Sequence, residues 1–262
     1  MLKHFFTTPL QLGIAQAVVA SIAAFAVVLL ARRRGIRLQT DAAIAMSRGI
    51  VQIVVVGSVL LLLLKQPRWT SVLLLAAMIV AAGATSSQRA KKLPGAFAVS
   101  TSAIACGAGS TIAIMTWLGV IDTAITSLVP IGSMLIANAM NANSLAMNRF
   151  RADVLAHVGE VETALALGAE AKRSVAPYVQ SAFEASLIPA IDSIRSLGIV
   201  WIPGLMAGML LSGANPVYAS IYQFVTLAMI LASSGLTSLV GTLLIRPRIF
   251  SEADQLLLRP AA

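Results

Sequence analysis

The feature that most constrains this chain is a succession of long apolar stretches, several of them about 20 residues long. A helix of roughly 20 apolar residues crosses the hydrocarbon core of a bilayer, which is about 30 Å thick. Charged residues make up only 11% of the 262 residues, whereas soluble domains carry about 25%. A chain with so little charge cannot cover a water-facing surface. We therefore expect an integral membrane protein whose solvent is lipid.

Seven stretches have the length and apolar character of membrane spans, and none shows the alternation of a barrel strand. Because lipid cannot satisfy backbone hydrogen bonds, each stretch must be helical. We predict an all-α polytopic membrane helix bundle of about seven transmembrane helices in one domain, residues 1–262. The stretches are Leu10–Ala31, Ala42–Leu64, Thr70–Thr85, Gly95–Leu118, Ala124–Met147, Ser193–Ser212 and Val217–Ile245.

The basic residues predict the orientation, because cytoplasmic loops carry an excess of lysine and arginine. There are 19 such residues. Lys3, Lys65 and Arg68 fall on one side of the predicted bundle, Arg48 lies inside the second span, and all the others fall on the opposite side. This distribution predicts an N-terminus outside and a C-terminus in the cytoplasm. Since the net charge of +9 follows membrane topology, we expect no nucleic-acid partner.

The sequence contains no recognisable motif for a metal or a nucleotide. Cys106 is the one cysteine, which excludes an intrachain disulfide or a cysteine cluster, and we expect it to be a buried packing thiol. His4 and His157 lie far apart and form no metal-binding spacing. A GxxxxGK[ST] phosphate-binding loop is absent from the sequence, so the chain is not expected to bind ATP. We predict no metal and no cofactor in this chain.

The longest polar interval, residues 148–191, is predicted to be a cytoplasmic segment. Within it, GEVETALALGA (Gly159–Ala169) has the pattern of an amphipathic helix. Such a helix can lie on the bilayer, cover its own bundle, or dock in the groove of a partner. The order Glu162, Ala164, Gly168 resembles the EAA loop of ATP-binding-cassette (ABC) importer permeases, which seats on the ATPase subunit. This resemblance implies a coupling site comprising Glu162, Ala164, Gly168, Lys172 and Arg173.

Longer motifs resemble one family. They are SRGIVQIVVVG (Ser47–Gly57), VPIGSMLIANAMNANS (Val129–Ser144), LGAEAKRS (Leu167–Ser174), SLIPAIDSIRSLGIVWIPGLMAGMLLSGANP (Ser186–Pro216) and YQFVTLAMI (Tyr222–Ile230). Together they resemble the FetB/YbbM-type permeases. These are small membrane subunits of bacterial ABC transporters assigned to iron export or iron homeostasis, with plant relatives linked to aluminium tolerance and to sugar-nucleotide transport.

The resemblance implies a non-catalytic permease of the bacterial inner membrane that forms a homodimer in the lipid bilayer. It would export iron or a related small solute. A separate cytoplasmic ABC-type ATPase subunit would bind ATP with Mg²⁺ and hydrolyse it. Two other functions stay open from the residues themselves. The chain could be a stand-alone secondary carrier, or a membrane scaffold that recruits a cytoplasmic partner through the same helix.

Polar residues inside the predicted spans mark either a solute path or interhelical packing. Arg48 and Gln52 share one helix face, where Arg48 either lines the path or extends to the headgroups. Asn138, Asn141 and Asn148 share one stripe of the fifth span. The stripe offers either neutral ligands for a solute or hydrogen bonds between helices. The candidate path residues are Arg48, Gln52, Ser133, Asn138, Asn141 and Gln223.

Two further pairs of residues each allow two interpretations. Asp192 and Arg195, at the predicted start of the sixth span, form either an ordinary i, i+3 ion pair or a gate. Gly204 and Gly208 form a GxxxG pattern, which indicates close helix packing. That packing lies either within the chain or at the seam of a dimer.

Overall fold

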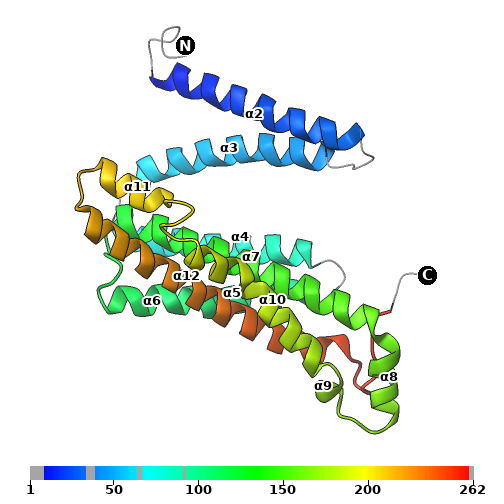
Figure 1. Cartoon of the computed structure of the whole chain (residues 1–262). Coiled ribbons are helices and arrows are strands. Elements are labelled where there is room, and N and C mark those ends of the chain that lie inside the picture. The colour runs from blue at the N-terminus through cyan, green and yellow to red at the C-terminus, as the bar shows by residue number, and fades with distance from the viewer. Residues whose placement is uncertain (1–8, 34–38, 64–66, 91–92, 260–262) are drawn as a thin grey trace. The chain divides into compact units, whose positions relative to one another are not determined.

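The computed structural model describes residues 9–33, 39–63, 67–90 and 93–259. The described part is nearly all helical, which confirms the predicted fold class. It contains no strand, only two isolated β-bridges. Six helical stretches are long and apolar enough to cross a membrane. The chain divides into two compact units, Met1–Gln66 and Pro67–Ala262, drawn in Figure 1.

The first unit is a pair of helices in contact with each other, α2 (Pro9–Arg33) and α3 (Gln39–Leu63). None of the residues in their most apolar windows is buried. Ile22 and Ile53, for example, are 65% and 68% exposed. Helices that are apolar on all sides need lipid or other protein around them. Taken by itself, the first unit therefore has the character of a membrane-inserted helix pair.

The second unit is built around two long helices, α7 (Ile125–Ala156) and α12 (Pro216–Ile245), which pack along each other. Helices α4 (Trp69–Arg89) and α5 (Ala96–Ile104) pack against each other and against this pair. On another side, α10 (Ala176–Arg195) contacts both α7 and α12. Figure 1 shows α10 running back along α7 from the end of the unit where α7 stops.

Helix α5 continues through a π-helical turn, η1 (Ala105–Gly109), into α6 (Ser110–Trp117). A Cβ atom on Gly107 would lie 2.6 Å from the backbone nitrogen of Thr237. Only glycine therefore permits this close approach of η1 to α12. Cys106 is exposed, which corrects the expectation of a buried thiol. The helix turns Gly107 and Ala108 toward its neighbours and turns Cys106 away from them.

One end of the second unit is formed by three short helices and the C-terminal segment. The helices are α8 (Val158–Ala166), α9 (Ala171–Ser174) and the 3-10 turn η2 (Arg246–Ile249). The segment that follows η2 buries Leu256 and Leu258 in the same apolar cluster as residues of α7, α8 and α10. The C-terminal segment is therefore part of the packed fold at this end.

The opposite end of the unit holds α11 (Gly204–Leu211) and the start of α12 (Figure 1). The side chain of Asn215 accepts from the backbone N–H groups of Val217 and Tyr218 and so caps α12. A Cβ added to Gly204 or Gly208 would meet nothing within 4 Å. Packing of the GxxxG face within the described chain is therefore not observed, and the dimer seam stays a prediction.

The predicted span Ser193–Ser212 is not one helix. Helix α10 ends at Arg195, residues 196–203 are not helical, and α11 begins at Gly204. Pro203 lacks a backbone N–H and precedes the first turn of α11, where a helix does not require one. Six candidate spans are found among the described residues, and the count of about seven spanning helices stays a prediction. The sidedness of the two termini stays a prediction.

Candidate functional site

A small cavity lies where α7, α10 and α12 meet. Its volume is about 150 Å³, enough for several water molecules or one small solute. It is lined by Asn138, Asn141, Ala142, Leu145, Ser186, Pro189, Ala190 and Ser234. The structure thus brings together two asparagines of the predicted stripe. The third, Asn148, is exposed and does not line the cavity.

A cation adjoins the cavity. The Nη1 atom of Arg89 donates to Oδ1 of Asn141 at 3.0 Å. Arg89 lies in the last turn of α4, where the helix dipole favours a positive charge. The sequence places Arg89 only among the basic residues of a loop. Its proximity to α7 is a tertiary contact with no local signal in the sequence.

The cavity offers neutral polar groups. Asn138 uses Nδ2 to donate to the carbonyl of Met134 at 2.8 Å, a bond that does not use its own carbonyl oxygen. Ser186 donates to the carbonyl of Phe183 at 2.7 Å, and Ser234 is 2% exposed. Amide and hydroxyl oxygens can hydrogen-bond a polar solute or coordinate a hard cation. Among the described residues, no group of three or more His, Cys, Asp or Glu is placed to hold a metal ion.

The other predicted path residues of the second unit, Ser133 and Gln223, do not line this cavity. Ser133 donates to a carbonyl of its own helix at 2.8 Å. Gln223 is buried, and its Oε1 accepts from the backbone N–H of Met206 at 3.3 Å. Gln223 therefore satisfies an amide in the first turn of α11. Arg48 and Gln52 are exposed on α3, in the first unit.

The predicted coupling residues lie at the end of the second unit that contains α8. Helix α8 ends in a Schellman motif, in which Ala169 N–H donates to the Ala164 carbonyl and Gly168 N–H donates to the Leu165 carbonyl, each at 3.0 Å. Gly168 has φ +87°, in the left-handed region that favours glycine. The glycine of the E-x-A-x-x-x-G pattern therefore ends the helix.

Glu162 and Gly168 lie on the wall of a groove with a volume of about 630 Å³. The opposite wall is formed by residues of the C-terminal segment between Ala253 and Arg259. Both Glu162 and Gly168 are exposed, and the neighbouring Leu167 is 84% exposed. This end of the unit thus presents a capped helix together with uncovered apolar and acidic side chains.

The remaining predicted charges are on the surface. Lys172 and Arg173 are exposed on α9, and Nε of Arg173 lies 3.7 Å from a carboxylate oxygen of Glu170. At the last turn of α10, Nη1 of Arg195 lies 3.6 Å from Oδ1 of Asp192, with both side chains more than half exposed. Exposed pairs of this kind add little stability. The proposed gate role of the second pair stays a prediction.

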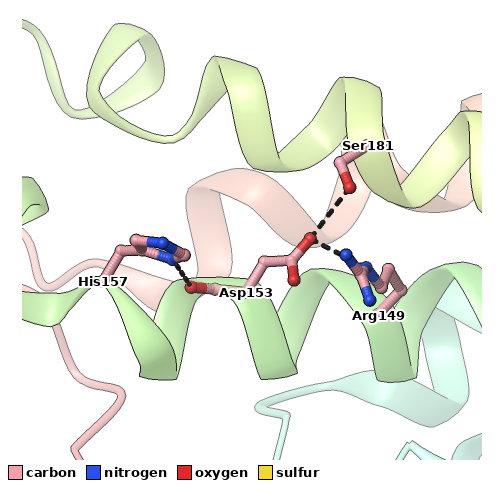
Figure 2. A network of polar contacts seen from close by, with 4 residues as sticks. All are labelled: Arg149, Asp153, His157 and Ser181. Carbon is pink, nitrogen blue, oxygen red and sulfur yellow. Dashed lines mark hydrogen bonds and ion pairs between the residues drawn. The ribbon is translucent and has the colours of Figure 1, made fainter.

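A polar network joins α7 to α10 just before α7 ends (Figure 2). The Oδ2 atom of Asp153 accepts from Nε of Arg149 and from the hydroxyl of Ser181, both at 3.0 Å. Nδ1 of His157 lies 2.8 Å from the backbone oxygen of Asp153. The Asp153 side chain is only 14% exposed, so its two side-chain partners compensate a largely buried charge.

Tyr178 extends this network to α8. Its ring stacks on His157 with 5.1 Å between ring centroids. Its hydroxyl donates to Oε2 of Glu160 at 3.1 Å. Burial raises the pKa of the Tyr178 phenol above its ordinary value, and the hydrogen bond and the negative charges of Glu160 and Asp153 raise it further. At neutral pH Tyr178 is therefore a protonated donor.

A buried polar cluster lies on the face of α7 that meets α4 and α5. Asn143 is fully buried and donates through Nδ2 to the hydroxyls of Ser86 at 2.9 Å and Ser100 at 3.0 Å. Ser144 donates to Ser86 at 3.1 Å. These bonds hold three helices together. The sequence shows a polar span here but not which of its amides face protein.

Comparison with known proteins identifies relatives. The model of the family described as "Uncharacterised protein family (UPF0014)" matches residues 14–250. The chain is 29% identical over 230 residues to the "Probable iron export permease protein FetB" of Escherichia coli (strain K12), covering 87% of this chain and 89% of that protein. It is 31% identical over 245 residues to "Protein ALUMINUM SENSITIVE 3" of Arabidopsis thaliana, covering 93% and 90%.

A further relative is "UPF0014 membrane protein YjkA" of Bacillus subtilis (strain 168), 31% identical over 219 residues, which are 83% of this chain and 88% of that protein. No solved structure matches the chain. The family match and the six candidate spans together make this chain an integral membrane protein.

Proposed function

Because the chain belongs to the uncharacterised protein family UPF0014, we propose that it is the permease subunit of an ABC transporter in a bacterial inner membrane. A separate cytoplasmic subunit binds ATP with Mg²⁺ and hydrolyses it, and the permease itself is not catalytic. The solute is iron or a related small species, and it is exported. The name of the Escherichia coli relative, which matches over 89% of its length, supports transport as the function.

The observation that carries the proposal is the separation of two features within one unit. The exposed α8 with its Gly168 cap lies at one end, whereas the cavity that has Asn138 and Asn141 in its wall lies between α7, α10 and α12. A transporter driven by a separate ATPase requires an exposed docking element and a site between helices where polar groups can contact the solute. We assign docking to α8 and α9, and solute contact to Asn138 and Asn141.

The chemistry of the cavity limits the solute. Amide and hydroxyl oxygens bind hard cations and polar solutes, whereas they bind soft thiophilic metals poorly. Arg89 occupies Oδ1 of Asn141 and adds a positive charge next to the cavity. A chelated or partly hydrated metal ion that carries anionic ligands suits this combination better than a bare cation. The proposal also includes a homodimer, for which the uncovered Gly204 and Gly208 of α11 supply a close-packing face.

The test begins with affinity purification of the tagged permease from native membranes. An ABC-type ATPase is expected to co-purify. The complex is then placed in liposomes, and ATP hydrolysis is measured with Fe²⁺, chelated Fe³⁺, other metals and UDP-sugars. Selective stimulation by an iron species supports the proposal in full, whereas stimulation by another solute keeps the permease and replaces iron. A purified permease with no ATPase partner refutes the ABC assignment.

A further inference from the structure

The first two turns of α10 are bound to α8 and to the end of α7. Tyr178 lies in the first turn and contacts α8 through the hydrogen bond to Glu160. The same ring stacks on His157, the residue between α7 and α8. One turn later, Ser181 donates to the largely buried Asp153 of α7. A displacement of α8 therefore acts directly on the start of α10.

The other half of α10 forms a wall of the cavity. Ser186, Pro189 and Ala190 line it, opposite Asn138 and Asn141 on α7. Ser186 follows Ser181 by little more than one helical turn, so one rigid stretch of helix links the network to the cavity. Helix α10 thus contacts the polar network at its start and the cavity in its second half.

Helix α10 packs closely on its neighbours. The residues that it buries, Ala182 and Ser186, are small, and small side chains let helix backbones approach each other closely. Pro189 lies inside the helix and removes one backbone hydrogen bond at the level of the cavity. A movement at the start of α10 therefore displaces Pro189, which lies in the cavity wall.

We propose that α10 is the lever that carries movement of α8 to the cavity, and that Tyr178 and Asp153 are the positioning residues that attach it. This inference rests on the proposed function, because the movement originates in an ATPase docked on α8. It assigns to these residues a role in transmission, separate from docking and from solute contact. Loss of their contacts uncouples ATP hydrolysis from the cavity and leaves the ATPase bound.

The experiment follows the cavity directly, so it needs no knowledge of the solute. Cys106 is replaced by serine, and Ala190→Cys introduces one thiol on the cavity wall. Its reaction rate with a water-soluble maleimide is measured in the purified complex with the ATPase, with and without ATP and vanadate. Trapping the nucleotide is expected to change the labelling rate when Tyr178 and Asp153 are intact.

The test variant combines Tyr178→Phe, which retains the stacking ring, with Asp153→Asn, which retains size. The matched control is Glu184→Gln, because Glu184 accepts a hydrogen bond from Gln180 at 2.8 Å on an exposed face of the same helix. The test variant is expected to retain the ATPase and to hydrolyse ATP, but to lose the nucleotide-dependent change in labelling. The control is expected to keep that change.

The proposed function and the proposed lever are refuted by different results. If no ATPase binds the intact permease, the proposed function fails and the lever fails with it. If the ATPase binds and the test variant still shows the full nucleotide-dependent change, the lever is refuted while the proposed function stands. If the test variant loses the ATPase itself, the network belongs to docking, and its assignment to transmission is overturned. If the double substitution unfolds the protein, Tyr178→Phe alone is tested in its place.

Discussion

Replacement of Gly168 separates the backbone requirement of the coupling site from its steric requirement. Gly168 has φ +87°, and a residue other than glycine in the left-handed region costs about 1–2 kcal/mol. That cost is a factor of about 5–30 in the equilibrium between the capped and the frayed end of α8. A Cβ atom at this position meets nothing within 4 Å. Gly168→Ala therefore carries backbone strain without a clash in the isolated permease.

Two larger substitutions complete the series. Asparagine tolerates the left-handed region, so Gly168→Asn adds bulk with little strain. Gly168→Arg adds strain, bulk and charge at the surface where the ATPase is proposed to dock. We expect Gly168→Ala to weaken ATPase binding by up to about 5–30-fold and Gly168→Arg to abolish it. The result for Gly168→Asn shows how much of the loss comes from bulk alone.

Gly213 provides the matched control. It has φ +88°, nothing lies within 4 Å of an added Cβ, and it ends α11 with a Schellman bond from Ala214 N–H to the Met209 carbonyl at 3.0 Å. Helix α11 lies at the opposite end of the second unit from α8 (Figure 1). Gly213→Arg thus introduces the same strain and the same side chain far from the proposed docking surface.

The assay is the amount of ATPase retained by equal amounts of tagged permease over a range of ATPase concentrations. Size-exclusion profiles of each variant confirm that the permease itself is intact. We expect Gly213→Arg to retain the ATPase as the unaltered chain does. If Gly168→Arg binds the ATPase as tightly as Gly213→Arg, α8 is not the docking element and the coupling assignment is wrong.

Three further predictions concern stability, solute contact and titration. Asn143→Ala removes two buried hydrogen bonds and leaves the Ser100 hydroxyl without its amide partner, whereas Ser86 keeps its bond to Ser144. The free energy of unfolding is therefore expected to fall by about 1–2 kcal/mol, measured by denaturant titration in detergent. Asn138→Leu together with Asn141→Leu is expected to abolish solute-stimulated ATP hydrolysis while the complex still assembles, whereas retained stimulation would assign these amides to packing. Ultraviolet titrations of the unaltered chain and of Tyr178→Phe differ by the phenol of Tyr178. This phenol is expected to ionise above the ordinary tyrosine pKa of 10.0. Because its pKa is raised, its contribution to stability is present at neutral pH and is lost as pH rises through the raised pKa.

Hydropathy predicts most of the fold because burial in lipid depends on composition over about 20 residues, which a sequence displays directly. It does not predict how α10 packs, because that helix carries Glu184, Asp192 and Arg195 and so has the composition of a water-facing segment. The described structure packs α10 along α7 and α12, and its cytoplasmic location stays a prediction. Its buried face consists of Ala182 and Ser186, and such small residues give little hydrophobic signal. The span Ser193–Ser212 was misplaced for another reason, because its apolar composition does not reveal that residues 196–203 are not helical.

Residues of the site could be predicted from the sequence only where side chains of the same type recur on one face of a single helix. Asn138 and Asn141 are neighbours on one turn, so their shared cavity follows from helical periodicity. Arg89 reaches Asn141 from another helix, 52 residues away in sequence, and local spacing contains no information on such a contact. Gly168 shows a different limit. Its place in the coupling pattern suggests a docking surface, whereas its positive φ shows that it also ends α8.

The polar residues of α7 divide between two faces, and this division bears on whether they serve as path or as packing. Asn143 is fully buried, and its Nδ2 atom donates to α4 and α5, so it holds the bundle together, although its buried Oδ1 atom has no hydrogen-bond partner. Asn138 and Asn141 face a cavity in which space remains. An amide packed among helices is out of reach of a ligand, whereas a solute site must hold groups that a ligand can still reach. Stability should therefore depend on Asn143 and solute stimulation on Asn138 and Asn141. Equal losses of stability at both faces would mean that α7 carries packing amides on both sides and that the solute passes elsewhere.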